Sequence, residues 1–433
     1  MNTHSPIAVL DAVRTPFAKA FTDLSGVSAV ELGRTAMTGL LTKLSCRCQD
    51  VDEVIFGNVG SPADAANIAR VIALRSGLSY HTIAHTVHRN CGSGMEAILG
   101  GWQAINHRGS KLVITGGTES MSSIPLFFSK DAQAYFTQLG RSKSWLQKLR
   151  TIGGFRPSFM RPIAGLRLGL TDPVCHMNMG ETAELLAKEF RISREDQDRF
   201  ALESHHKAEA AFEACYLTSE VTPVELENGK KVERDNTIRV GQTMQALAKL
   251  KPVFAKQGSV TAGNSSPLTD GAAALALCLP EHVSEYTDQP LGYVTAYSIA
   301  GCDPSRMGLG PVYAIAKLMD QTGYTLNDFD LIEINEAFAA QVIACRKAIE
   351  SRHFAADYLN RRQALGEWPE PRVNVLGGAI ALGHPVGATG ARLVLTLLRT
   401  LKARGLHRGL ATLCIGGGQG MAMVVETQIG SES

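Results

Sequence analysis

The stretch Asn90-Cys91-Gly92-Ser93-Gly94 places a cysteine between an apolar run over residues 81–87 and a helix-favouring run over residues 95–104. This order predicts that Cys91 lies at the N-terminus of a helix, where free N–H groups and the helix dipole stabilise a thiolate. The two glycines leave room beside the sulfur because glycine carries no Cβ. On its own, the stretch is equally typical of a reactive cysteine and of a buried, inert one.

Two further glycine-rich stretches near the C-terminal end favour the reactive role. Gly383-His384-Pro385 supplies a histidine in a tight loop, and Cys414-Ile415-Gly416-Gly417-Gly418 supplies a second cysteine. Acyl transfer through a thioester needs a thiolate, a base that generates it, and backbone N–H groups that face the developing oxyanion. The three stretches together therefore indicate covalent acyl transfer with Cys91 as the nucleophile.

In these and other stretches, which follow one another in the family's order, the sequence resembles the thiolase family. The similar blocks are Val13-Arg14-Thr15-Pro16-Phe17, Asn90-Cys91-Gly92-Ser93-Gly94, Thr261-Ala262-Gly263-Asn264-Ser265-Ser266, Asn335-Glu336-Ala337-Phe338-Ala339, Gly383-His384-Pro385-Val386-Gly387-Ala388-Thr389-Gly390 and Cys414-Ile415-Gly416-Gly417-Gly418-Gln419-Gly420. Within the family, the long central insertion is most similar to the β-subunit of the fatty-acid oxidation trifunctional complex. Asn335 departs from that subgroup, which usually has histidine there.

The sequence predicts an α/β fold with an internal duplication. Residues 52–57 parallel residues 329–334, and residues 111–117 parallel residues 410–417. Each half alternates apolar strands with amphipathic helices, which predicts a mostly parallel sheet covered on both faces. The resemblance implies the thiolase fold, in which two β-α-β-α-β halves are stacked in five layers and the active site lies at their junction.

We expect three segments along the chain. Residues 1–120 form the N-terminal half, which residues from about 251 to 279 complete; residues 121–250 form an inserted loop domain that covers coenzyme A; residues 280–433 form the C-terminal half. Within the insertion, the sequence predicts a helix over residues 179–190 and a second helix that Ser193 caps and that runs toward Cys215.

The resemblance also implies a role for each catalytic residue. Cys91 attacks the 3-oxoacyl thioester and holds the acyl group, and His384 deprotonates Cys91. Cys414 exchanges the proton of the acetyl-CoA carbanion. Gly416 and the Cys91 N–H form one oxyanion hole, while Asn335 holds a water that binds the other thioester oxygen together with His384.

Contacts to coenzyme A are expected at two residues. Ser266 matches the serine that touches the pantetheine arm in the family, and Arg239 matches an arginine near the nucleotide end. We expect coenzyme A and acyl-CoA as substrates, with no permanently bound cofactor and no metal, because two cysteines and a histidine handle the protons. Asn178 stands where the short-chain acetoacetyl-CoA thiolases usually have histidine, and Pro267 stands where a glycine is common.

Three functions are compatible with this pattern. The first is thiolytic cleavage of 3-oxoacyl-CoA to acetyl-CoA and a shortened acyl-CoA, as in fatty-acid β-oxidation. The second is a biosynthetic acetyl-CoA C-acetyltransferase that forms acetoacetyl-CoA. The third is a catalytically silent scaffold or lipid-binding subunit, and the complete set of Cys91, Asn335, His384 and Cys414 argues against it.

A basic, aromatic-rich segment over residues 127–170 stands out within the insertion. It carries eight Lys or Arg residues against the single acid Asp131, with aromatic side chains interleaved. Such a segment is compatible with peripheral contact to a membrane surface. It is equally compatible with binding a hydratase/dehydrogenase subunit, with lining an acyl tunnel, or with a solvated basic face over a small local core.

The composition of the chain limits the remaining classes of function and of cellular location. The chain has 433 residues, of which 45% are hydrophobic, and a formal net charge of +2, too small to suggest nucleic acid as a partner. Neither chain end carries the pattern of a signal peptide, a transit peptide or a peroxisomal signal. Nine scattered cysteines are typical of a reducing compartment. We therefore expect a cytoplasmic protein, and the resemblance implies a homodimer or homotetramer.

Overall fold

The computed structural model describes residues 5–44 and 48–430, and nine of its longer strands run through one mixed sheet. In spatial order these strands are β12 (Leu331–Ile334), β13 (Arg408–Ile415), β14 (Gln419–Glu426), β11 (Gly292–Gly301), β1 (Ile7–Arg14), β10 (Thr269–Cys278), β5 (Val113–Ser120), β3 (Glu53–Gly57) and β4 (Ile83–Val87); the short β2 (Ala18–Lys19) pairs with β10. The expectations drawn from the chain ends concern residues 1–4 and 431–433, which lie outside the described residues.

The internal duplication is confirmed. β3 lies parallel to β5 in the N-terminal half, and β12 lies parallel to β13 in the C-terminal half, as the repeated sequence predicts. The expectation of a mostly parallel sheet is wrong, because β10 runs antiparallel to both β1 and β5, and β14 runs antiparallel to both β11 and β13. Only three residues, Gly416 to Gly418, connect β13 to β14, and a link that short joins antiparallel strands.

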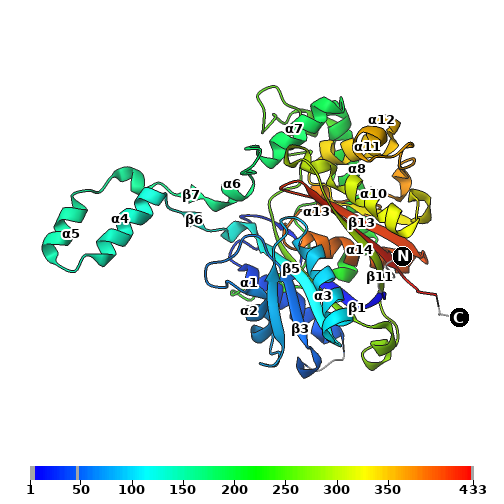
Figure 1. The fold of residues 1–433 in the computed structure, drawn as a ribbon, viewed down its shortest axis with the longest axis horizontal. Coiled ribbons are helices and arrows are strands. Elements are labelled where there is room, and N and C mark those ends of the chain that lie inside the picture. Colours follow the sequence, from blue (N-terminus) through cyan, green and yellow to red (C-terminus); the bar gives the residue numbers. More distant parts are fainter. Residues whose placement is uncertain (1–4, 45–47, 431–433) are drawn as a thin grey trace.

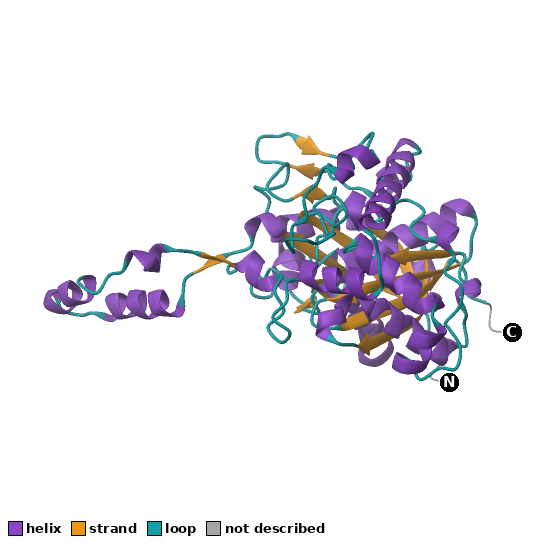
Figure 2. Cartoon of the chain, turned by 90° about the horizontal axis from the view of Figure 1, so that it is seen from above, coloured by secondary structure: helices purple, strands orange, loops and turns teal. Residues whose placement is uncertain are grey.

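Helices cover both halves and fill the space between them (Figures 1 and 2). The first hydrophobic core packs α1 (Ala29–Lys43) and α2 (Ile68–Arg75) against the N-terminal strands. The central core places α3 (Ser93–Arg108) and α14 (Thr389–Arg404) between the strands of both halves. The third core packs α10 (Gly310–Thr322) and α11 (Ala339–Glu350) on the C-terminal strands, which gives the five layers of the expected thiolase fold.

The insertion between β5 and β10 contains the two predicted helices. α7 (Met179–Glu189) starts at a capping box built on Asn178, and α8 (Arg194–Glu213) starts at a capping box built on Ser193. The helix predicted over residues 179–190 and the cap at Ser193 are therefore confirmed. The remaining elements of this region are α9 (Met244–Ala248), β8 (Val224–Glu225) and β9 (Lys231–Val232); α12 (Arg352–Tyr358) and α13 (Ala379–Leu382) follow in the C-terminal half.

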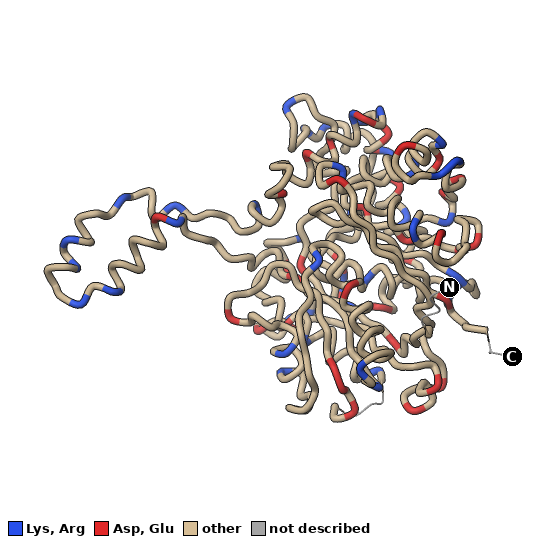
Figure 3. Tube along the Cα trace, in the orientation of Figure 1, with Lys and Arg blue, Asp and Glu red and all other residues tan. Residues whose placement is uncertain are grey.

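The basic segment forms an arm that projects from the body of the molecule (Figure 1). Its neck is a two-stranded ribbon of β6 (Leu126–Phe127) and β7 (Ile163–Ala164), and its tip holds α4 (Lys130–Arg141) and α5 (Trp145–Ile152). The short helix α6 (Gly165–Gly169) leads the chain back to the body. Basic positions are spread along the arm with a single acidic one among them (Figure 3).

Candidate active site

Cys91 lies immediately before α3, whose N-cap is Gly92, so the predicted position at a helix N-terminus is confirmed. The side chain is half-buried. Burial raises the pKa of the Cys91 thiol above its usual value, although backbone N–H groups of Gly416 and of Cys91 itself act in the opposite direction. The charge of Glu119 raises this pKa further. At rest the group is therefore a thiol, and it needs a base to become a nucleophile.

His384 lies in the loop that joins α13 to α14, and it is buried. Its Nδ1 is 2.6 Å from the Thr389 hydroxyl, which is itself 3.0 Å from the carbonyl oxygen of Pro385. Burial lowers the pKa of His384 to about 3, and the charge of Arg392 lowers it further. The ring is therefore neutral near neutral pH, the state in which a histidine accepts a proton.

Asn335 stands behind His384, directly after β12. Its Nδ2 makes a long contact of 3.5 Å with Nε2 of His384. Its Oδ1 is buried and has no hydrogen-bond partner within residues 5–44 and 48–430. Buried polar atoms are seldom left unpaired, so this acceptor suits the water that the resemblance implies at this position.

Cys414 is the penultimate residue of β13 and is 1% exposed. Burial raises the pKa of its thiol well above the usual value, and the neighbouring Cys91 adds to the effect. The turn after β13 lies against the loop that carries Cys91, because the Asn90 side chain donates a hydrogen bond of 2.7 Å to the Gly416 carbonyl. Asn90 itself has a positive φ of 45°, a conformation that asparagine tolerates better than most residues.

A single apolar cavity brings the reactive side chains together. Cys91, His384, Cys414 and Ser266 all line it. Asn335 and Gly416 do not line the cavity. Asn335 contacts the His384 ring from outside it, and the backbone of Gly416 lies beside the Cys91 sulfur. The rest of the wall is mainly apolar: Met121, Leu170, Met179, Phe254, Leu268, Met307, Phe338 and Val386. Such a lining suits an alkyl chain next to the thiols.

Arg239 lies outside this cavity, in a neighbouring pocket. Lys19 and His205 line the same pocket, and both pockets share Ser265 and Pro267. The expected contacts to the two ends of coenzyme A, Ser266 and Arg239, therefore lie in adjoining spaces. Burial and the charge of Arg239 lower the pKa of His205 to about 4, so this pocket holds a neutral imidazole beside two cationic side chains.

The sequence did not point to several residues of the site. Thr389 stands five residues after His384 in the same sequence block. Nothing else in the sequence indicates that its hydroxyl contacts the histidine. Met121 and Leu170 come from the two roots of the arm, which the sequence alone does not bring to the thiols. Glu119 contributes charge near Cys91 although it stands in an ordinary strand pattern.

Across residues 5–44 and 48–430, no cluster of three or more His, Cys, Asp or Glu side chains is arranged to hold a metal ion. The helices in this part of the chain are all too short or too polar to cross a membrane.

Comparison with known proteins identifies the family. The model of the thiolase N-terminal domain matches residues 7–281, and the model of the thiolase C-terminal domain matches residues 288–427. The chain belongs to the thiolase family. The resemblance seen in the sequence blocks is thereby confirmed, whereas the likeness to the trifunctional β-subunit stays a prediction.

Individual members are similar to this thiolase over almost their whole length. It is 39% identical to a 3-ketoacyl-CoA thiolase of Yersinia enterocolitica, with 98% of this chain and 97% of the relative covered. It is 40% identical to a 3-ketoacyl-CoA thiolase of Alteromonas mediterranea with the same coverage.

Two solved structures share the fold at a TM-score of 0.85. The acetyl-CoA acetyltransferase of Bacillus anthracis is 36% identical, with 98% of this chain and 100% of that one covered. The human mitochondrial 3-ketoacyl-CoA thiolase in complex with CoA is 35% identical, with 98% and 99% covered.

Proposed function

We propose that the protein is a 3-ketoacyl-CoA thiolase, an acyltransferase of fatty-acid β-oxidation. It cleaves a 3-oxoacyl-CoA with coenzyme A and releases acetyl-CoA and an acyl-CoA shortened by one acetyl unit. The observation that carries the proposal is the shared cavity, in which Cys91, His384 and Cys414 meet beside an apolar wall. Relatives named 3-ketoacyl-CoA thiolase, 39–40% identical over nearly the full chain, support the same reaction.

In the first half-reaction, Nε2 of His384 takes the Cys91 proton, and the thiolate attacks the 3-oxo carbon. The bond between C2 and C3 breaks, which leaves the acyl group on Cys91 and a carbanion on acetyl-CoA. Cys414 gives its proton to that carbanion, and the proton held by His384 then restores the Cys414 thiol. The N–H of Gly416, which faces the Cys91 sulfur, suits an oxyanion close to this atom.

In the second half-reaction, the thiol of a free coenzyme A attacks the acyl-Cys91 thioester. His384 accepts the proton of this thiol, and the Cys91 sulfur leaves and recovers that proton. The pocket that holds Arg239 and Lys19 suits the anionic nucleotide end of coenzyme A, since cationic side chains bind phosphate groups. No metal and no bound cofactor takes part in this scheme.

The alternative is the biosynthetic direction, an acetyl-CoA C-acetyltransferase that forms acetoacetyl-CoA. The structural likeness to an acetyl-CoA acetyltransferase favours it. The apolar wall of the cavity favours the degradative reaction, because acetoacetyl-CoA has no longer alkyl chain to pack against it. Thiolysis measured from 3-oxobutyryl-CoA to 3-oxopalmitoyl-CoA separates the two. We expect kcat/KM to rise with chain length; activity confined to the shortest substrate would favour the biosynthetic enzyme.

We further propose that the enzyme is a homodimer, or a homotetramer built from such dimers, in the cytoplasm. β4 is an edge strand of the sheet, and no other strand pairs with its outer side within the described part of the chain, where the Ala84 carbonyl accepts from the Asn67 side chain. Its side chains are exposed or half-buried, and Ile83 is 59% exposed. An edge strand without a neighbouring strand and with an exposed apolar side chain suits a two-fold pairing with a second copy. The eight described cysteines are all free, which fits a reducing compartment.

The arm is proposed to dock on an anionic membrane. Five aromatic rings of the arm, those of Phe128, Tyr135, Phe136, Phe155 and Phe159, pack against one another, and among them only Phe159 is buried. α5, by contrast, exposes Trp145, Leu146, Leu149 and Ile152, each to more than half, beside Lys143, Lys148 and Arg150. Apolar groups flanked by cations suit an interfacial helix. A hydratase/dehydrogenase subunit is the other candidate for this surface.

A further inference from the structure

Glu119, in β5, is fully buried and accepts four hydrogen bonds. Its Oε1 accepts from Nδ2 of Asn58 at 3.1 Å and from the N–H of Gly60 at 2.8 Å. Its Oε2 accepts from the N–H groups of Val59 and Gly387, each at 3.0 Å. Both carboxylate oxygens are thus saturated by donors from two separate segments.

These two segments belong to different halves of the molecule. Asn58, Val59 and Gly60 follow β3 directly in the N-terminal half. Gly387 lies three residues after His384, in the loop between α13 and α14 of the C-terminal half. The carboxylate of Glu119 therefore links the loop that carries His384 to the half that carries Cys91.

The backbones of the two halves approach each other closely around this link. A Cβ on Gly117 would lie 1.9 Å from the carbonyl oxygen of Gly387, and a Cβ on Gly390 would lie 2.3 Å from the nitrogen of Met95. No side chain fits between the loop and β5, or between the first turn of α14 and α3, at these points. Backbone thus packs directly on backbone here. The hydrogen bond from Gly387 to Glu119 adds a directional contact, which fixes the position of the His384 loop on the N-terminal half.

The charge of Glu119 also affects the pKa of Cys91. Burial raises the pKa of Glu119 to about 7, three backbone N–H groups act against that effect, and the nearby carboxylate of Asp270 adds to it. The negative charge of Glu119 in turn raises the pKa of Cys91. A substitution that removes the charge would therefore change Cys91 directly, whereas Glu119→Asp keeps the charge in place.

We propose that Glu119 is a positioning residue: its carboxylate anchors the His384 loop to the N-terminal half and so holds His384 in reach of Cys91. The inference rests on the proposed function, since it assumes that His384 acts as the base for Cys91. Glu119 does not line the cavity, so apart from the effect of its charge on Cys91 it acts on the reaction through the loop.

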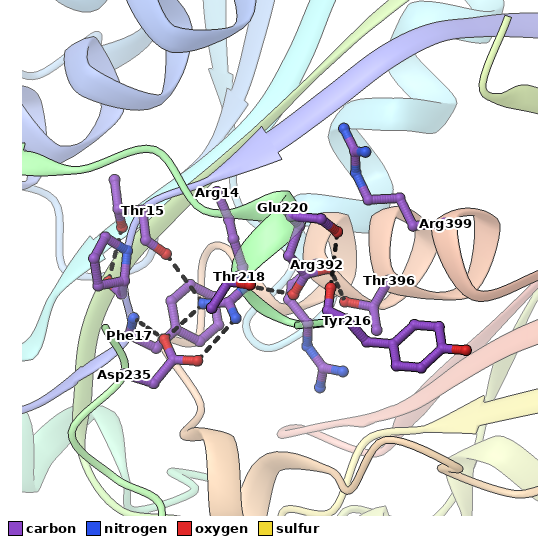
Figure 4. A network of polar contacts seen from close by, with 12 residues as sticks. Arg14, Thr15, Phe17, Tyr216, Thr218, Glu220, Asp235, Arg392, Thr396 and Arg399 are labelled. Atoms are coloured by element: carbon purple, nitrogen blue, oxygen red, sulfur yellow. Dashed lines mark hydrogen bonds and ion pairs between the residues drawn. The ribbon is translucent and has the colours of Figure 1, made fainter. Parts of the chain in front are cut away.

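A second buried carboxylate offers a matched control (Figure 4). Glu220 is 1% exposed and also joins the two halves, because it binds Arg14 of β1 at 2.5 Å and accepts from Thr396 of α14 at 2.9 Å. Arg14 continues the network to Asp235. None of these residues lines the active-site cavity, and their hydrogen bonds in the described structure go to residues outside the His384 loop.

The test compares Glu119→Asp with Glu220→Asp. Each keeps its charge and shortens the side chain by one methylene, which withdraws the carboxylate from its donors. We expect Glu119→Asp to lower kcat for thiolysis by about tenfold or more with little change in KM, because small misplacements of catalytic groups are that costly. Glu220→Asp should lower the melting temperature but leave kcat near wild type. Equal kcat losses in both variants would overturn the proposal.

A double-mutant cycle shows whether Glu119 acts through His384. The readout is the rate at which iodoacetamide alkylates Cys91, which needs no substrate. Glu119→Asp should slow this alkylation in the wild-type background and have no further effect in His384→Ala. Equal slowing in both backgrounds would overturn the proposal. Should Glu119→Asp fail to fold, Glu119→Gln takes its place in the same cycle. Because this variant loses the charge, its effect on alkylation in the His384→Ala background measures the charge alone. An additional slowing when His384 is present supports the proposal, and the same effect in both backgrounds would overturn it.

The same readout separates this proposal from the proposed function. A wild-type protein whose Cys91 alkylation depends on His384 but which performs no thiolysis would contradict the proposed function alone. In that case the double-mutant cycle still decides the role of Glu119.

Discussion

The Thr389 hydroxyl lies 2.6 Å from Nδ1 of His384 and donates its own hydrogen to the Pro385 carbonyl at 3.0 Å. Because that hydrogen is used, the Thr389 oxygen accepts from Nδ1–H, and the proton of the neutral ring resides on Nδ1. Nε2 then keeps its lone pair and faces the amide of Asn335. One hydroxyl thus fixes the tautomer that His384 needs as a base.

Thr389→Val should therefore impair catalysis without changing the shape of the site. Valine has the same outline but leaves Nδ1–H of His384 buried without an acceptor, at a cost of about 1–3 kcal/mol. We expect kcat to fall by about tenfold or more with little change in KM, because the basic tautomer is no longer favoured. Thr389→Ser, which keeps the hydroxyl, should stay near wild type. Equal kcat values for the valine and serine variants would contradict this role.

The second thiol is expected to act only when carbon–carbon bonds break. Cys414→Ser should still permit acylation of Cys91 by acetyl-CoA but lose thiolysis, since a hydroxyl is a far poorer proton donor near neutral pH. His384→Ala should impair both reactions. Rapid-mixing measurements of acylation and of thiolysis distinguish the two patterns. Thiolysis near the wild-type rate in Cys414→Ser would make the second cysteine structural.

Buried His384 also predicts how stability depends on pH. Its pKa is lowered to about 3 in the folded protein, whereas an unfolded histidine titrates near its usual 6.5. Between these values the unfolded chain binds the extra proton, so this residue's contribution to stability falls as the pH drops from about 6.5 toward 3. Thermal melts from pH 7.5 to pH 5 should show a smaller loss in His384→Gln than in the wild type. Parallel curves would contradict a neutral buried ring.

The arm is expected to bind membranes through its charge as well as its apolar face. Lys143→Glu with Lys148→Glu should weaken co-sedimentation with liposomes of phosphatidylserine and phosphatidylcholine by at least about tenfold, since each cation near the surface contributes about 1 kcal/mol. Turnover of a short substrate should not change. The matched control is Lys230→Glu with Lys231→Glu, on exposed positions of the body.

Two outcomes would contradict membrane docking by the arm. If liposome binding survives the Lys143 and Lys148 substitutions, the arm is a solvated face. If the Lys230 and Lys231 control loses binding equally, the loss reflects the net charge of the protein and not the arm. Loss of co-sedimentation with a hydratase/dehydrogenase subunit, but not with liposomes, would assign the arm to that protein instead.

Local patterns in the sequence predicted the parts of the fold that depend on near neighbours. The helix after Cys91 and the cap at Ser193 follow from residues a few positions apart. The direction of β10 was not predictable in this way, because an apolar run is the same whether its neighbours are parallel or antiparallel. That direction is set by how the chain returns from the insertion.

The same distinction holds within the site. Cys91, His384 and Cys414 stand in recognisable glycine-rich blocks, so chemistry and family resemblance both point to them. Glu119 and Leu170 carry no such pattern. Glu119 matters because distant backbone donors converge on it, and Leu170 because the root of the arm reaches the cavity. Contacts of that kind exist only once the chain has folded.

Mass spectrometry of the acyl-enzyme shows which cysteine carries the acyl group. The protein is incubated with acetyl-CoA, quenched in acid and digested, and the acetylated peptide is located. We expect one acetyl group on Cys91, its absence in Cys91→Ala, and loss of thiolysis in that variant although its fold is retained. An acetyl group found only on another cysteine, or thiolysis that persists in Cys91→Ala, would contradict this expectation.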